Sequence, residues 1–110
     1  MIPQSQLEDM FDNMRAKTKW NVDGPMLWGY FFMDPNADKF RKASEYLLNE
    51  GYRFVDIHPT DDGDTCVLHV ERTETHSPQT LFERNEYLYG VAARFELELY
   101  DGMDVGPPAN

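Results

Sequence analysis

Two histidines and two glutamates lie close together in one stretch of the chain, and their side chains are suited to chemistry. The stretch is Val67–Pro78, VLHVERTETHSP, and it holds His69, Glu71, Glu74 and His76. Imidazole nitrogens and carboxylate oxygens ligate metals, and a histidine paired with a glutamate can act as acid and base. The pattern predicts a strand over residues 65–72, a polar turn, and a helix that begins at Ser77-Pro78.

Alternation along this strand divides the side chains between two faces. One face carries His69, Glu71 and Thr73, and the other carries Cys66, Leu68 and Val70. The apolar set indicates the core, so Cys66 is expected to be an inert core thiol. The polar set must meet water, a partner or a site.

A metal site would need more ligands than this face supplies. His69, Glu71 and His76 have the right chemistry, and Asp101 and Asp104 could add oxygen donors. The expected topology places the His76 and Asp101 regions at opposite ends of the sheet, about 20 Å apart. The acidic turn Thr60–Asp64, TDDGD, lacks the later glutamate of a calcium loop. We therefore expect no metal and no cofactor.

The sequence also offers no recognisable catalytic arrangement. Cys66 and His69 fall on opposite faces of one strand, and no nucleophile elbow or glycine-rich phosphate loop is present. A His69–Glu71 pair is too unspecific to indicate a reaction. We expect a protein that is not an enzyme and has no catalytic residues.

Local signals along the chain predict the elements that position these side chains. An extra N-terminal helix is expected over Gln6–Thr18, with a capping box that starts at Ser5, so residues 1–20 form a separate segment. Residues 21–110 form the main domain. Its expected elements are a strand at Met26–Met33, a helix at Pro35–Asn49 ending before Gly51, a strand at Tyr52–His58, the turn Thr60–Asp64, the strand 65–72, a helix at Pro78–Arg94, and a strand at Glu96–Tyr100.

The order of these elements, β-α-β-β-α-β, predicts an α+β, ferredoxin-like sandwich. The strand order is expected to be 4-1-3-2, with strands 26–33 and 65–72 central and parallel, and with both helices on one face. Leu27, Gly29 and Phe31 are expected beneath the helices, together with Leu68, Val70, Leu97 and Leu99. The closing segment 101–108 is expected to be a turn.

The chain has 110 residues and a net charge of −10, which restricts its partners. Such acidity disfavours direct binding of nucleic acid or of anionic membranes. No apolar run approaches the length of a bilayer span, and the N-terminus does not resemble a signal peptide, so a cytoplasmic protein is expected.

The open face of the sheet is the predicted partner-binding surface. Its aromatic and acidic residues suit a basic protein segment, because arginine stacks on aromatic rings and pairs with carboxylates. The predicted partner-binding residues are Trp28, Tyr30, Phe32, His69, Glu71, Glu98, Tyr100, Asp101 and Asp104. Coverage of this face by the N-terminal helix, or by a second subunit in a homodimer, is an equally strong expectation.

Several blocks of the chain are similar to one known family. WGYFFMDP, HVERTETHSP and YDGMDVGP, together with Gly51-Tyr52, resemble the RraB family of bacterial regulators of ribonuclease E over Trp20–Pro108. The resemblance implies a small acidic cytoplasmic protein with a ferredoxin-like sandwich. It further implies an inhibitor that binds the basic scaffold region of ribonuclease E. The acidic tail of the enterobacterial members is not found in this sequence.

Two other functions stay open at this point. One is a dimeric ferredoxin-like protein that binds a small ligand, or acts as an enzyme, in a cavity on the open sheet face. The other is a plain structural or dimerisation module. A bound ligand near Trp28 and His69 would favour the first.

Overall fold

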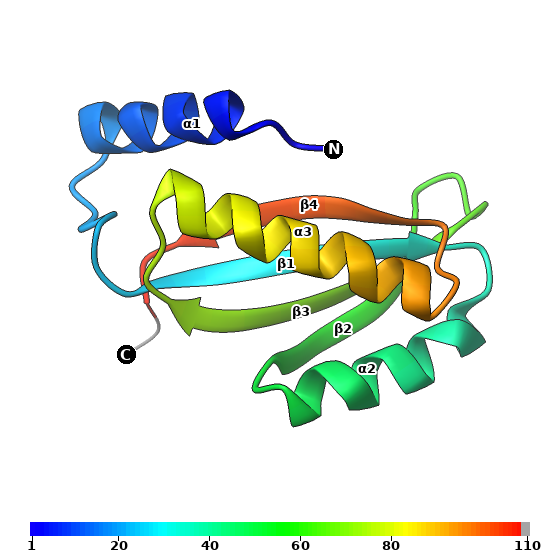
Figure 1. The fold of residues 1–110 in the computed structure, drawn as a ribbon. Helices are drawn as coiled ribbons and strands as arrows, with labels where there is room; N and C mark the ends of the chain where they lie inside the picture. Colours follow the sequence, from blue (N-terminus) through cyan, green and yellow to red (C-terminus); the bar gives the residue numbers. More distant parts are fainter. Residues whose placement is uncertain (109–110) are drawn as a thin grey trace.

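The structure is a computed structural model that describes residues 1–108, and it has the predicted α+β class. Three helices and a short 3-10 turn accompany a four-stranded sheet (Figure 1). The elements are α1 (Gln4–Lys17), β1 (Met26–Asp34), η1 (Ala37–Lys39), α2 (Phe40–Asn49), β2 (Arg53–Pro59), β3 (Cys66–Glu74), α3 (Pro78–Arg94) and β4 (Leu99–Gly106).

The sheet has the order β2-β3-β1-β4, and every neighbouring pair is antiparallel. Strands β1 and β3 are central, as expected, but the expected parallel pairing between them is wrong. The physical reason lies in the connections. The crossover through α2 makes β2 parallel to β1, and the tight turn at residues 60–65 then reverses the chain into β3.

Antiparallel pairing also reverses the expected faces of β1. Tyr30 lies opposite Val70 and Phe32 lies opposite Leu68, and directly opposed residues share a face. Trp28, Tyr30 and Phe32 therefore lie with Leu68 on the helix side, where all four are fully buried. The expectation that these aromatic residues face the open side is wrong.

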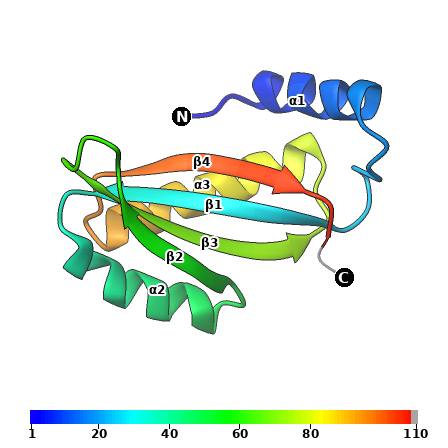
Figure 2. The same cartoon turned by 180° about the vertical axis from the view of Figure 1, so that it is seen from behind.

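All three helices lie on one side of the sheet. Figure 1 shows α3 crossing in front of the strands, and Figure 2 shows the opposite face with no helix over it. Helix α1 packs against α3 and brings Phe11 to 6.0 Å from the ring of Trp28. The N-terminal helix thus helps to cover the aromatic residues of β1.

Helix α1 begins at Gln4, after Pro3, so the capping box predicted to start at Ser5 is wrong. Other predicted signals are confirmed. Ser77 caps α3 in a capping box with Thr80, and Gly51 follows α2 with a φ of 99°. In the turn at residues 60–64, the Asp62 carboxylate accepts a hydrogen bond from the backbone N–H of Asp64.

The fourth strand occupies Leu99–Gly106 rather than Glu96–Tyr100. Its pairing with β1 shifts register where Phe31 opposes Gly102 and Phe32 opposes Tyr100, so Asp101 is the extra residue of a bulge. As a result, Tyr100 is buried against Phe32, while Leu99 is 37% exposed. The expected positions of Tyr100 and Leu99 were therefore the reverse of the observed ones.

Asp34 joins the end of β1 to the start of β4. Its carboxylate is buried and accepts hydrogen bonds from the backbone N–H groups of Asn36 and Glu98, both at 2.8 Å. Lys39 Nζ lies 3.7 Å from the same carboxylate. This one side chain fixes both the entry to α2 and the loop that leads from α3 into β4.

Asp34→Ala should lower the free energy of unfolding by about 2–3 kcal/mol, because two backbone N–H groups lose a buried, charged acceptor. Chemical denaturation measures the change, and hydrogen exchange at the Glu98 amide should accelerate. Asp38→Ala, an exposed acid in the same turn, should change stability by less than about 0.5 kcal/mol. Equal losses in the two variants would contradict this role for Asp34.

Candidate functional site

The uncovered face of the sheet is built from rows of side chains that cross all four strands. The register aligns Arg53, Glu71, Gly29 and Asp104 in one row. The next row contains Asp56, His69, Phe31 and Gly102. These residues lie on the face that is turned toward the viewer in Figure 2, over which no helix passes.

Gly29 makes room at the centre of this face. A Cβ atom at this position would lie 2.7 Å from His69 Nε2 and even closer to Asp104 Oδ1. Real Cβ atoms do not approach other atoms this closely, so these two side chains converge over the bare backbone of Gly29. The glycine therefore allows an imidazole from β3 and a carboxylate from β4 to meet above β1.

An aromatic platform adjoins this convergence. The rings of Phe31 and His69 are stacked, with centroids 4.3 Å apart and planes inclined by 27°. Both residues are half-buried, so part of the stacked pair faces solvent. A flat cation such as guanidinium can stack on a platform of this kind and still reach a neighbouring carboxylate.

The acids on this face differ in how far they are already neutralised. Arg53 Nε donates a hydrogen bond to Glu71 at 2.8 Å, and Asp56 lies 2.8 Å from His58 Nδ1. Asp104 is exposed, and no cation of residues 1–108 forms an ion pair with it. Asp104 is thus the carboxylate best placed to receive an external cation.

The predicted partner-binding residues divide into two groups. His69, Glu71 and Asp104 come together around Gly29, and Glu98 and Asp101 are exposed near the start of β4. Trp28, Tyr30, Phe32 and Tyr100 lie beneath the helices. Phe31 was missed, because both faces of β1 are apolar in sequence and the wrong one was assigned to the core.

A second polar cluster lies at the far end of β3, on the helix side of the sheet. Its centre is Glu74, whose side chain is only 8% exposed. Tyr30 donates its hydroxyl to Glu74 Oε2 at 2.7 Å, and Arg84 donates to Oε1 at 2.6 Å. His76 Nε2 lies 2.9 Å from the same carboxylate. Sequence reasoning had noted Glu74 and His76 but not the tyrosine and arginine that join them.

The electrostatics of this cluster follow from its burial and its hydrogen bonds. Burial opposes ionisation of Glu74, but the bonds with His76 and Tyr30 and the nearby charge of Arg84 outweigh it, so the pKa of the carboxyl lies below its ordinary value. Burial raises the pKa of Tyr52, which accepts a hydrogen bond from Arg84, to about 12. The cluster therefore consists of a carboxylate, a guanidinium and neutral tyrosines.

The nearby hydroxyl of Thr80 does not make this cluster a reaction centre. His76 Nδ1 lies 3.0 Å from Thr80 Oγ1, which suggests a hydroxyl, imidazole and carboxylate in line. However, the Thr80 hydroxyl already accepts a hydrogen bond from the backbone N–H of Ser77 and belongs to the cap of α3. The cluster is best described as a polar joint between β3, β1 and α3.

The described chain, residues 1–108, has no group of three or more histidine, cysteine or acidic side chains that could hold a metal ion. His76 lies behind the sheet, separated from the open-face group of His69 and Asp104. Among the same residues, no helix is long and apolar enough to cross a membrane.

A comparison with protein-family models gives one match over residues 4–105, described as regulator of ribonuclease activity B. The matched region extends from the first residue of α1 almost to the end of β4. No curated protein matches the chain.

Proposed function

Because the chain belongs to the family of regulators of ribonuclease activity B, we propose that it binds a basic segment of a ribonuclease through the open sheet face. The expected target is the scaffold region of ribonuclease E, and the expected effect is inhibition without catalysis by this protein. The compartment in which the two proteins would meet is the cytoplasm.

The observation that supports this proposal is the convergence over Gly29. There, the stacked rings of Phe31 and His69 adjoin the unpaired carboxylate of Asp104. An arginine of the target could lay its guanidinium on the platform and pair with Asp104. The net charge of −10 would speed the encounter with a basic segment.

We also infer a ferredoxin-like arrangement for the scaffold that presents this face. Read from β4, the strand order is 4-1-3-2, and the helices α2 and α3 lie on one side. Such an arrangement leaves the other side of the sheet uncovered by its own helices, which suits a surface for a partner.

Asp104→Lys should weaken binding of a purified ribonuclease E scaffold fragment by about tenfold or more, since it places a cation where an arginine is expected. Calorimetric titration measures the affinity. The matched control is Glu8→Lys on α1, which changes the net charge equally but lies away from the open face. The control should bind nearly as the natural chain does.

The salt dependence of association and a test of RNA binding provide results that could contradict the proposal. Association should slow as salt rises from about 0.05 M to about 0.5 M, because exposed charges are screened over about 8 Å at physiological salt. Polyuridine RNA should not bind. Undiminished binding by Asp104→Lys, or tight binding of the RNA, would contradict the proposal.

A further inference from the structure

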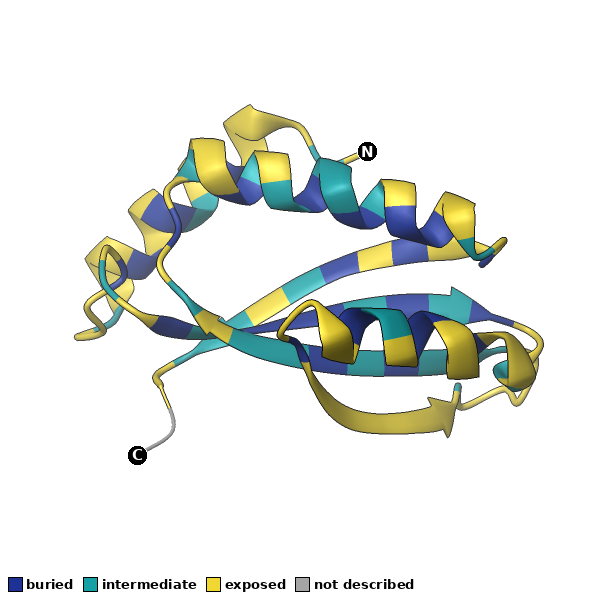
Figure 3. Cartoon of the chain, turned by 60° about the horizontal axis from the view of Figure 1, so that its bottom comes forward, coloured by how far each residue is buried: buried dark blue, intermediate teal, exposed yellow. Residues whose placement is uncertain are grey.

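The edge of the sheet formed by β2 exposes an unusual amount of apolar surface. Among the described residues, the more exposed large hydrophobic side chains include four from α2 and β2. They are Leu48, Phe54, Val55 and Ile57, with exposed fractions of 46%, 43%, 38% and 40%. Figure 3 shows β2 exposed along its whole length, in contrast to the alternating burial of the other strands.

Helix α2 packs on β2 and β3, but it leaves part of this surface open. Tyr46 packs on Phe95 with ring centroids 5.5 Å apart, and the Tyr87 hydroxyl donates to that of Tyr46 at 3.1 Å. Helix α2 also contacts α3 and the residue that follows it through these rings. A groove of about 920 Å³ remains around it, lined in part by Leu48, Phe54 and Ile57.

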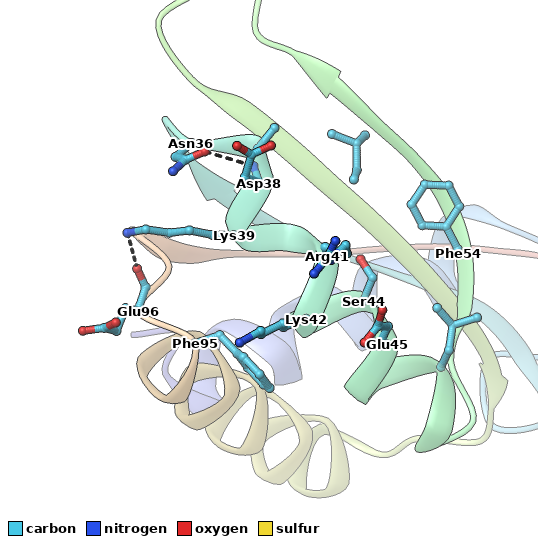
Figure 4. Close-up of a pocket in the computed structure, with 13 residues that line it drawn as sticks. Asn36, Asp38, Lys39, Arg41, Lys42, Ser44, Glu45, Phe54, Phe95 and Glu96 are labelled. Atoms are coloured by element: carbon cyan, nitrogen blue, oxygen red, sulfur yellow. Dashed lines mark hydrogen bonds between the residues drawn. The ribbon is translucent and has the colours of Figure 1, made fainter.

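Figure 4 shows how this groove is built. Phe54 of β2 faces Arg41 and Ser44 of α2, while Lys42 and Phe95 lie on the other side of the helix. The Ser44 hydroxyl is buried and has no hydrogen-bond partner within residues 1–108. An apolar floor with charged residues at its border is characteristic of a protein interface.

The outer backbone edge of β2 is also unpaired among the described residues. Strand β2 pairs with β3 alone, and residues 1–108 provide no strand on its outer edge. Its outward N–H and C=O groups are thus available to a further strand. The apolar side chains and the open backbone edge are two independent features of one surface.

We propose that a second copy of this chain binds here, with β2 of the two copies antiparallel in one continuous eight-stranded sheet. The distribution of residues along β2 suits a contact between two identical strand edges. The irregularity between Phe54 and Asp56 puts Phe54 and Ile57 both on the helix side, although they are three residues apart. A twofold axis that sets Phe54 opposite the partner's Ile57 therefore joins apolar residues on the same face, twice.

The charged residues of β2 favour the same register between the two copies. On the open side, Arg53 would then lie diagonal to the partner subunit's Asp56, within reach of its long side chain. The pairing shifted by one residue would instead set Asp56 directly opposite the partner's Asp56, which repulsion disfavours. The contact does not depend on the ribonuclease and is centred on the outer edge of β2, although Arg53 and Asp56 also belong to the rows of the open face.

The experiment is sedimentation of the full chain over a concentration series. The natural protein should reach twice its chain mass of 12.9 kDa, with half-association in the micromolar range. Ile57→Lys should raise the half-association concentration by about tenfold or more, since it places a cation in the apolar contact. The matched control Leu99→Lys, equally exposed on β4, should associate like the natural chain.

A charge exchange tests the register itself. Asp56→Arg alone should weaken association, and the double variant Arg53→Glu with Asp56→Arg should restore it. Circular dichroism confirms that each variant is folded, and Val55→Lys replaces Ile57→Lys if the latter is not. A natural chain that stays monomeric up to about 1 mM, or an Ile57→Lys dimer as strong as the natural one, would overturn the proposal.

Discussion

Leu68→Asp should abolish the folded state at room temperature. Leu68 is fully buried on β3, opposite Phe32 and beneath the helices. An unpaired carboxylate at such a position costs several kcal/mol, in addition to the lost apolar contact. Because small domains are stable by only about 5–15 kcal/mol, the loss should leave little or no cooperative unfolding transition. Thermal denaturation followed by circular dichroism measures the result.

The neighbouring residue supplies the control for this experiment. Val67 lies on the same strand but on the open face, where it is half-buried opposite Met33. Val67→Asp should therefore keep a cooperative transition at a modestly lower temperature. If Leu68→Asp melts like the natural chain, or if Val67→Asp is the more damaging change, the assignment of the two faces of β3 is wrong.

Glu74→Gln should have the second largest effect, about 2–3 kcal/mol of unfolding free energy near neutral pH. The change keeps the shape of the side chain but removes the charge that Arg84 and Arg72 pair with, and bonds to a buried charged group are the stronger ones. Chemical denaturation measures the loss. Glu83→Gln, an exposed acid next to Arg84 in α3, should change stability little.

The pH dependence gives this prediction a definite sign. The pKa of Glu74 in the folded chain lies below its ordinary value of 4.5, so its ionised form stabilises the fold above that pH. This contribution disappears as the pH falls through the lower, folded value. The difference in stability between the natural chain and Glu74→Gln should therefore be full near neutral pH and should narrow as the pH falls through the lowered pKa of the folded chain. A difference that is constant from neutral to acid pH would contradict the role given to this carboxylate.

The elements with strong local signals were the ones that the sequence could predict. Helix α3 has a capping serine, a proline at its first position and a clear apolar stripe, and its predicted bounds are confirmed. Strand β3 alternates apolar and polar residues, so Leu68 and His69 were assigned to the correct faces. In both cases the information lies within the element itself.

The failures arose where the information lies in a partner strand. Strand β1 is apolar on both faces, so its own residues do not say which face is buried; the antiparallel pairing of Tyr30 with Val70 decides it. Strand β4 contains two aspartates and two glycines, which are typical of turns, and it becomes a strand by pairing with β1. The error in β1 explains why Tyr30 leaves the candidate site and Phe31 enters it, and the error in β4 explains why Tyr100 is buried.

The position of β4 beside β1 has a consequence for how the protein is made. Residues from opposite ends of the sequence, such as Leu27 and Gly106, are neighbours in the sheet. A ribosome releases β1 long before β4, at about 5–20 residues per second. Throughout that interval one edge of the central, aromatic strand has no strand beside it. The sheet can form completely only after residue 106 has emerged, so until then this edge of β1 is exposed to aggregation and to chaperones.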